Sequence, residues 1–414
     1  MSKEKRRVPK LRFPGFTEDW EQRKLNEFLS VSNLKNTENK YNKKDVLSVS
    51  GDYGIVNQID FQGRSFAGAS VSNYGVVEKG DIVYTKSPLK LNPYGIIKTN
   101  RLNNGIVSTL YAIYKTKENC DSKFIEHYFN LDSRLNQYLK PLVNKGAKND
   151  MKVSSENALI GEVCFPKITE QALIADLLDR LDIYITLHQR KLDNLKLKKK
   201  ALLKKLFPKN GERYPELRFP GFTDAWEQRK LSDISTKVTT KNVDVHYTET
   251  LTNSAEQGII SQVDFFDKEI SNKDNINGYY IVENNDFIYN PRISTLAPVG
   301  PINRNKLNRA GIISPLYTVF RASNVDLGFL EWYFQSSHWH RYMKLNGDSG
   351  ARADRIAIKD STFFDMPIKT PVTIKEQVLI GETLEKFNQY ITLHQRKLDH
   401  LKLQKKALLQ QMFV

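Results

Sequence analysis

Two pairs of loops carry side chains that suit the edges of nucleic-acid bases. The first pair follows predicted strands and reads TKSPLKLNPYG at 85–95 and NPRISTLAPVG at 290–300. The second pair precedes predicted long helices and reads NKGAKNDMK at 144–152 and DSGARADR at 348–355. Arg and Lys suit guanine edges, whereas Asn and Gln suit adenine. The candidate base contacts are Lys86, Ser87, Lys90, Asn92, Lys145, Lys148, Asn149, Lys152, Asn290, Arg292, Ser294, Thr295, Arg352 and Arg355.

The two loops of each pair hold matching places in the sequence but carry different polar groups. Matching places with different groups are expected when one scaffold presents two different surfaces. Each residue taken alone is more often an ordinary surface group than a DNA contact, because polar side chains are mostly exposed.

Other patterns that could do chemistry give weaker signals. No glycine-rich phosphate loop or dinucleotide-binding fingerprint occurs. NPY at 92–94 and NPR at 290–292 faintly resemble the Asn-Pro-Pro-aromatic motif of amino-methyltransferases, but both lack the second proline. His338 and His340 have no third metal ligand nearby in the sequence, and two cysteines cannot build a four-ligand zinc site. We therefore expect neither a catalytic nor a metal centre; a nuclease with an unrecognised active site is the alternative.

The charge indicates a polyanionic partner. The 414 residues include 63 Lys and Arg against 47 Asp and Glu, a net charge of +16. Basic and acidic residues number 26 and 18 in 1–166, 11 and 5 in 167–210, 19 and 20 in 211–372, and 7 and 4 in 373–414. Clustered Lys and Arg bind duplex DNA through counterion release. The basic run at 190–209 either lies along phosphates or forms a solvated helix face.

No apolar run is long enough to span a bilayer, and the basic N-terminus is not followed by the apolar core of a secretory signal. A cytoplasmic protein is therefore expected.

The chain contains one plan twice. LRFPGFTEDWEQRKL at 11–25 returns at 217–231 with 13 of 15 residues identical, and ITLHQRKLDNLKLKKKALLKKLF at 185–207 returns at 391–413 with 18 of 23 identical. Both blocks repeat at an offset of 206 residues. The interiors diverge, although YGIVNQIDF at 53–61 still answers QGIISQVDF at 257–265. A repeat of this length predicts two similar domains.

The interiors predict mixed α/β structure. Runs rich in Val, Ile, Tyr and Phe predict strands at 81–85, 106–114, 286–289 and 312–320. Apolar residues at helical spacing predict helices at 122–139 and 327–345.

Heptads begin at Thr169 and again at Thr373. In each copy, eight of ten seam positions are apolar, a narrow stripe that is typical of a coiled coil. Pro208 is expected to end the first helix. The central seam residues are Leu178, Leu181, Ile185, His188, Leu192, Leu195, Leu384, Phe387, Ile391, His394, Leu398 and Leu401.

The internal duplication suggests that each seam packs against the other, although homo-oligomerisation is the usual role of a heptad. The first helix ends where the second domain begins, and the second helix begins where that domain ends. The C-terminus of one helix is therefore next to the N-terminus of the other, and the pair must be antiparallel. About 37 residues at roughly 1.5 Å each would then make a stiff spacer of about 55 Å. We expect His188 to share a layer with Lys405, and Lys199 to share one with His394. The predicted fold class is α+β, with two similar mixed α/β domains joined and separated by these helices.

These features together resemble the specificity subunit of a type I restriction-modification system. The likeness extends from Leu11 to Phe413 and rests most strongly on the paired EQ-to-LHQRKL blocks that start at Glu170 and Glu376. It implies two target recognition domains at 1–166 and 209–372, each reading half of a bipartite DNA sequence, and two spacer helices at 167–208 and 373–414.

The resemblance also implies partners. They are double-stranded DNA, two adenine-N6 methyltransferase subunits that carry S-adenosylmethionine, and two ATP-dependent restriction and translocase subunits that use Mg²⁺. The helices are implied to dock the methyltransferases, and this chain is expected to be non-catalytic with no cofactor of its own. The alternative is a stand-alone architectural or regulatory DNA-binding protein.

Overall fold

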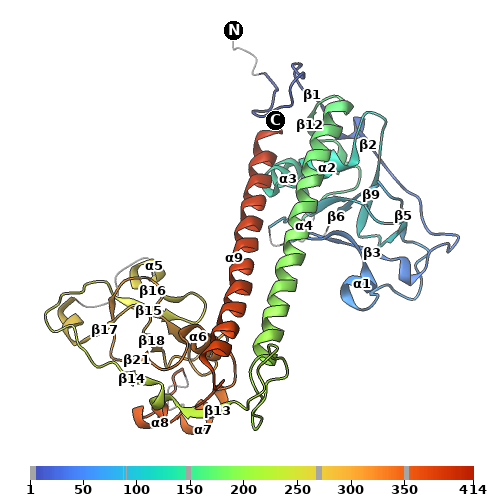
Figure 1. Ribbon diagram of the computed structural model, residues 1–414. Helices are drawn as coiled ribbons and strands as arrows, with labels where there is room; N and C mark the ends of the chain where they lie inside the picture. The colour runs from blue at the N-terminus through green and yellow to red at the C-terminus, as the bar shows by residue number, and fades with distance from the viewer. Residues whose placement is uncertain (1–5, 87, 90, 146–150, 267–272, 349–353) are drawn as a thin grey trace. The chain divides into compact units, whose positions relative to one another are not determined.

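The computed structural model describes residues 6–86, 88, 89, 91–145, 151–266, 273–348 and 354–414. The chain divides into two compact units. Unit 1 contains Met1–Gln189 and Arg396–Val414, and unit 2 contains Arg190–Gln395. Two helices of 38 residues, α4 (Ile168–Lys205) and α9 (Ile374–Gln411), each contribute one segment to both units (Figure 1).

Unit 1 is built around a four-stranded antiparallel sheet with the order β2-β9-β6-β7. Further antiparallel pairs are β1 with β12, β3 with β4, β5 with β8 and β10 with β11. The strands are β1 (Glu21–Lys24), β2 (Leu29–Val31), β3 (Leu47–Ser50), β4 (Gly54–Asn57), β5 (Gly75–Val77), β6 (Ile82–Thr85), β7 (Ile96–Thr99), β8 (Gly105–Val107), β9 (Tyr111–Thr116), β10 (Asn144–Lys145), β11 (Met151–Lys152) and β12 (Glu162–Phe165). The short helices are α1 (Gln58–Gln62), α2 (Ser122–Tyr128) and α3 (Asp132–Leu139).

Unit 2 repeats this topology, with the sheet order β14-β21-β18-β19 and the pairs β13 with β22, β15 with β16 and β17 with β20. Its strands are β13 (Glu227–Lys230), β14 (Ser235–Lys237), β15 (Leu251–Ser254), β16 (Gly258–Ser261), β17 (Tyr280–Val282), β18 (Phe287–Tyr289), β19 (Ile302–Arg304), β20 (Gly311–Ile313), β21 (Thr318–Ala322) and β22 (Pro367–Thr370). Its short helices are α5 (Gln262–Phe266), α6 (Leu327–Gln335), α7 (His340–Asn346) and α8 (Asp360–Phe364).

Four of the predicted elements are interrupted. The strand predicted at 106–114 is divided between β8 and β9 by a turn in which Tyr111 N–H donates to Ser108 O, and Tyr317 N–H donates to Ser314 O at the same place in unit 2. The helix predicted at 122–139 breaks before α3, and its counterpart breaks between α6 and α7. In the two helices, apolar residues recur on both sides of the break, so the hydrophobic pattern did not locate it. In the two strands, the break falls at the polar or proline pairs Ser108-Thr109 and Ser314-Pro315.

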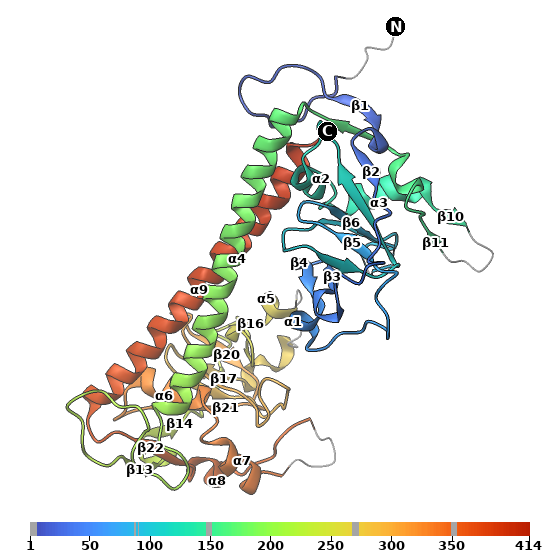
Figure 2. The same ribbon diagram turned by 90° about the vertical axis from the view of Figure 1, so that its right-hand side faces the viewer.

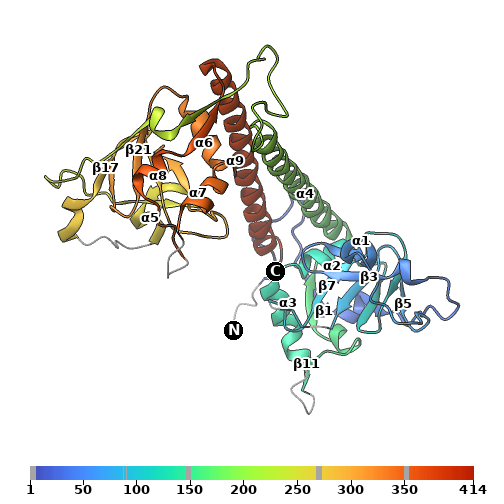
Figure 3. The ribbon, with the colours of Figure 1, turned by 90° about the horizontal axis from the view of Figure 1, so that it is seen from below.

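One short helix in each unit packs between the long helices and the strands. In unit 1, α2 lies beside α4 (Figure 1 and Figure 2). Its Phe124 and Ile125 share a core with Ile174 and Leu178 of α4. In unit 2, α6 lies between α9 and the strands (Figure 3), and Phe329 of α6 shares a core with Ile380 and Leu384. A Cβ on Gly381 of α9 would lie 3.0 Å from the Gly328 carbonyl carbon, so paired glycines allow this close approach.

The nearly identical LRFPGF blocks fasten the ends of the long helices. Leu11 N–H donates to Gln411 O at the end of α9 in unit 1, and Leu217 N–H donates to Lys205 O at the end of α4 in unit 2, both at 2.9 Å. Trp20 then packs edge to face on Phe413, and Trp226 packs the same way on Phe207. The duplication therefore preserves, in each unit, a site where the LRFPGF block and the tryptophan hold the end of a long helix. We call this site the LRFPGF socket.

The twelve central seam residues are all buried or half-buried. Within unit 1, Lys405 Nζ lies 2.6 and 2.8 Å from the Asp182 carboxylate, and within unit 2, Lys199 Nζ lies 2.8 Å from Asn388 Oδ1. Both contacts fit one antiparallel register. This register differs from the expected His188–Lys405 and Lys199–His394 layers, because the ammonium groups meet oxygen acceptors at Asp182 and Asn388 instead.

At the start of α9, only one of the two hydrogen bonds of a capping box is formed. Glu376 N–H donates to Thr373 Oγ1 at 3.4 Å, but the Glu376 carboxylate accepts two hydrogen bonds from Arg218 instead of returning to the cap.

Candidate nucleic-acid interface

The loop after β18 in unit 2 is held in one conformation by its own backbone. Ser294 and Ala297 exchange two N–H to O hydrogen bonds of 3.0 and 3.2 Å. Gly300 closes the loop at φ 82°, where a Cβ would lie 2.1 Å from Asn290 O. Its counterpart Gly95 in unit 1 has φ 94°, with a Cβ position 1.7 Å from Thr85 O. Only glycine fits such contacts, so both units keep the same loop geometry.

A second loop meets the first at one antiparallel bridge, which pairs Arg292 with Arg355. Ile293 N–H donates to Asp354 O at 2.8 Å, and Ile356 N–H donates to Pro291 O at 2.9 Å. Both arginines are exposed. Two residues named independently from the sequence, 63 positions apart, thus lie side by side.

This bridge borders a surface hollow of about 240 Å³. The hollow lies wholly in unit 2, and four candidate base contacts line it: Asn290, Arg292, Ser294 and Arg355. Its remaining walls combine polar groups of β15 with apolar side chains, and include Thr252, Asn253, Ser254, Phe265, Phe266, Ile293, Leu316 and Tyr317.

Asn290 and Ser294 hold the loop in place. Asn290 Nδ2 donates to Asn253 O at 2.9 Å, and Asn290 Oδ1 accepts from Arg292 N–H at 3.0 Å. Ser294 Oγ accepts from Ala297 N–H at 3.1 Å. Thr295 is exposed at the turn, and Arg352 lies outside the described residues. Asn290 and Ser294 therefore fix the backbone of the loop at Arg292.

The unit 1 candidates are placed less completely. Lys86 is half-buried at the end of β6, whereas Ser87, Lys90, Lys148 and Asn149 lie outside the described residues. The backbone of Lys145 and Lys152 belongs to the β10–β11 pair.

Asn92 occupies an internal position that the sequence did not predict. It is buried, and its Nδ2 donates to Asp132 Oδ1 at 2.8 Å. Its backbone N–H and O bond with Leu89 across the turn. Asn92 therefore holds the loop against α3 through Asp132 and does not present its amide at the surface. The equivalent residue of unit 2 is Ala297.

Sequence reasoning did not select the aromatic residues of the hollow. Phe265 and Phe266 are 39% and 40% exposed, with ring centroids 4.7 Å apart. Phe265 belongs to the segment Gln-Val-Asp-Phe, which repeats Gln-Ile-Asp-Phe of unit 1. Phe61, the equivalent residue of unit 1, is also exposed, and its ring centroid lies 5.4 Å from that of Tyr53. An exposed aromatic residue repeated in two divergent interiors was the available signal.

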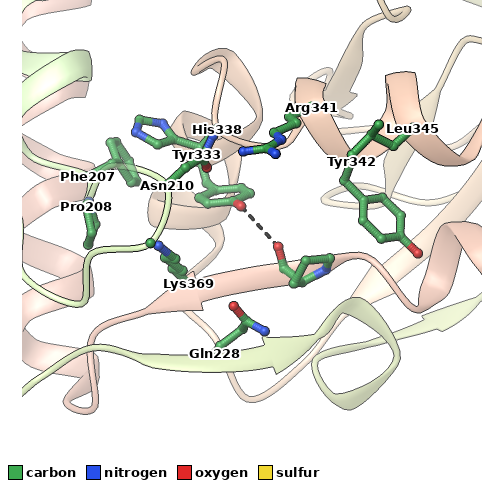
Figure 4. A pocket seen from close by; sticks show the side chains of 12 residues that line it. Phe207, Pro208, Asn210, Gln228, Tyr333, His338, Arg341, Tyr342, Leu345 and Lys369 are labelled. Atoms are coloured by element: carbon green, nitrogen blue, oxygen red, sulfur yellow. Dashed lines mark hydrogen bonds between the residues drawn. The ribbon is translucent and has the colours of Figure 1, made fainter.

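A second hollow of unit 2, about 250 Å³, lies near the end of α4 (Figure 4). Lys369 Nζ donates there to the carbonyls of Lys209 and Glu212, and Tyr333 OH donates to Pro367 O. Burial, with a smaller effect from Lys369, lowers the pKa of His338, and burial lowers the pKa of His340 to about 4. Arg341 is exposed at its edge. Because Lys369 already has two backbone acceptors, this hollow is a weaker candidate for an anionic partner.

The described residues contain no group of three or more His, Cys, Asp and Glu side chains placed to hold a metal ion. No helix in the described part of the chain is long and apolar enough to cross a membrane.

No family model and no curated protein matches this chain. Solved structures do match it. The S subunit of a type I restriction-modification system from M. genitalium is 12% identical, with 98% of this chain and 99% of that chain covered at a TM-score of 0.59. The HsdS subunit from Thermoanaerobacter tengcongensis is 15% identical, with 97% of each chain covered at a TM-score of 0.42.

A chain from a structure of type I R-M system complex assembly and conformational transition is 17% identical. It covers 97% of this chain and 98% of its own length at a TM-score of 0.46. The M. genitalium match and the topology above confirm the predicted fold class of two mixed α/β domains and two long helices. The chain therefore has, over nearly its whole length, the fold of a type I restriction-modification S subunit.

Proposed function

We propose that this chain is the DNA sequence-specificity subunit of a type I restriction-modification complex. It recognises a bipartite, interrupted DNA target and directs adenine-N6 methyltransferase and ATP-dependent restriction subunits to that target. The observation that carries the proposal is the duplication: both units share topology and end blocks, yet their reader loops carry different groups. Two different readers on one frame suit an asymmetric target whose half-sites are separated by a fixed spacer.

In this proposal, residues 1–166 and 209–372 are the two target recognition domains. Residues 167–208 and 373–414 form the spacer helices, whose length sets the number of unread base pairs. The reader surface of unit 2 is the hollow bordered by Arg292 and Arg355, and the reader surface of unit 1 is formed by the matching loops around Lys86 and Lys152. Methylation and cleavage are performed by partner subunits, which supply S-adenosylmethionine, ATP and Mg²⁺.

Each long helix carries one of two equivalent exposed surfaces, as expected if two copies of the same partner bind. Tyr184 and Leu187 of α4 are 57% and 54% exposed, and Tyr390 and Leu393 of α9 are 56% and 59% exposed. These residues are equivalent by the 206-residue offset and stand outside the seam. Exposed apolar pairs on charged helices mark protein contacts. We assign one methyltransferase subunit to each pair, and two restriction subunits to the assembled complex.

The test is a comparison of methylated bases. N6-methyladenine is mapped across the genome of the host with this gene intact, deleted and restored. We expect one interrupted sequence motif to lose methylation on deletion and to regain it on restoration. Unchanged methylation together with altered transcription would favour a stand-alone DNA-binding protein. Cleavage of DNA by the purified chain with only a divalent metal added would favour a nuclease.

A further inference from the structure

The arginines of unit 2 fall into two groups. Most described arginines outside the long helices donate to acceptors within the protein. These are Arg213, Arg218, Arg229, Arg304, Arg309 and Arg321. Among the described residues of the same region, the guanidinium groups of Arg292, Arg341 and Arg355 have no hydrogen-bond or ion-pair partner. Two of these three border one hollow.

The arrangement of Arg292 and Arg355 is unfavourable for the free protein. The flanking hydrogen bonds from Ile293 and Ile356 make them a non-hydrogen-bonded antiparallel pair. In such a pair the Cα atoms are about 4.5 Å apart and the side chains share one face. Like charges directly opposite each other destabilise a sheet. A ligand that accepts hydrogen bonds from both guanidinium groups would relieve this repulsion.

The surroundings determine which ligand fits. The amides of Asn290 and Asn253 are already used, since Asn253 Nδ2 donates to Ile288 O and its Oδ1 accepts from Asn303. Among the described residues at this edge, the charged donors without a partner are therefore the guanidinium groups of Arg292 and Arg355. The hollow beside them has apolar walls from Phe265, Phe266 and Leu316.

We propose that Arg292 and Arg355 form a two-pronged donor site for the N7 and O6 atoms of guanine, so that the half-site read by unit 2 contains guanine. This inference rests on the proposed function. In the major groove guanine presents two acceptors and no donor, whereas adenine and cytosine each present a donor that would face the arginines. A phosphate also presents acceptors, but it contacts side chains without sequence preference.

The experiment selects duplexes from a random library with the purified full-length chain and with single variants. Arg292→Gln and Arg355→Gln remove the guanidinium donors and put in their place an amide that suits adenine. We expect the wild type to select an interrupted motif, and both variants to lose its guanine preference in the same half-site by about tenfold or more. Arg341→Gln, which changes another exposed arginine of unit 2 outside this hollow, should select the wild-type motif.

Replacing the assigned guanine with 7-deazaguanine removes N7 alone. It should weaken wild-type binding and leave nearly unaffected only the variant that has lost the arginine at N7. Glutamine variants that keep the guanine preference, or alanine variants that weaken all sequences equally and reduce the salt dependence, would assign the arginines to phosphates and overturn the inference. A wild-type chain that selects an interrupted motif without guanine in the affected half-site would overturn it and leave the proposed function standing. Selection of no motif at all would overturn both.

Discussion

A buried ion pair joins each LRFPGF block to the start of a long helix. Arg12 contacts the Glu170 carboxylate at 2.7 and 2.8 Å, and Arg218 contacts Glu376 at 2.8 and 2.9 Å. The glutamate side chains are only 1% and 2% exposed. Bidentate arginine contacts of this kind satisfy both carboxylate oxygens. One charged contact thus joins the repeated LRFPGF block of each unit to the first turn of a long helix.

We expect Arg12→Ala to destabilise unit 1 by about 3 kcal/mol, because it leaves the Glu170 carboxylate buried without its partner. Arg6→Ala, which breaks an exposed pair with Asp19, should have a much smaller effect. Chemical denaturation of the full chain measures both changes. The double variant Arg12→Met with Glu170→Leu should recover most of the loss, and equal effects of Arg12→Ala and Arg6→Ala would contradict a buried pair.

Asp179 of α4 connects the helix to the domain of unit 1. Its carboxylate lies 2.8 Å from His127 Nε2, 2.7 Å from Arg101 and 3.2 Å from Lys123. Burial alone would raise the pKa of Asp179, but hydrogen bonds from His127 and Arg101 outweigh burial and hold this pKa well below its usual range. A depressed folded-state pKa stabilises the fold above the unfolded-state value of about 4 and loses this effect as pH falls.

Unit 1 should therefore lose stability as the pH falls below about 4, and Asp179→Asn should reduce that loss. Thermal unfolding of the full chain between pH 3 and 7 gives the comparison. Asp176→Asn, which removes an exposed carboxylate paired with Arg180 on the same helix, should leave the pH profile near that of the wild type. Parallel profiles for Asp179→Asn and the wild type would refute the assignment.

Residue type alone could not separate exposed candidate base contacts from residues whose side chains hold the loops in place. Arg292 and Arg355 were chosen for their guanidinium groups. Both residues are exposed, and neither guanidinium has a hydrogen-bond partner among the residues that the structure describes. Asn92 and Asn290 were chosen because amide side chains suit adenine, but their amides are hydrogen-bonded to backbone and side-chain partners inside the fold. The difference lies in the tertiary partners, which a single sequence does not display.

At the scale of elements, the long helices were the most predictable feature. Seven-residue periodicity requires no tertiary information, and both helices run close to the expected bounds. Their register was less accessible, since it depends on where Lys405 and Lys199 find oxygen acceptors. Those acceptors are equivalent by the duplication, yet one is the Asp182 carboxylate and the other the Asn388 amide.

The exposed helix pairs give a prediction about assembly. Tyr184→Ala with Leu187→Ala should remove one methyltransferase copy from the complex, and Tyr390→Ala with Leu393→Ala should remove the other. Leu197→Ala provides a control, because Leu197 is also exposed on α4 but lies ten residues farther along. The mass of the purified complex reports the number of copies. Loss of both copies from either double variant would show that the two sites are not independent.

At the scale of the whole molecule, the duplicated frame makes the two helices equivalent. Each helix ends in the LRFPGF socket of a different unit, through Gln411 and Lys205. The seams share one antiparallel register through the contacts of Lys405 and Lys199. An insertion in one helix would therefore shift its seam against the other, whereas equal insertions in both keep the layers matched.

Insertion of one heptad into both α4 and α9 should lengthen the unread spacer without changing either half-site. Seven residues add about 10.5 Å at 1.5 Å each, and DNA rises 3.4 Å per base pair, so the spacer should grow by about three base pairs. Duplex selection with the full-length variant measures the new spacing directly. Insertion in α4 alone should abolish selection of the spaced site, because the socket contacts and the seam register can no longer be met together. A double insertion that selects the original spacing would refute the idea that helix length sets the spacer.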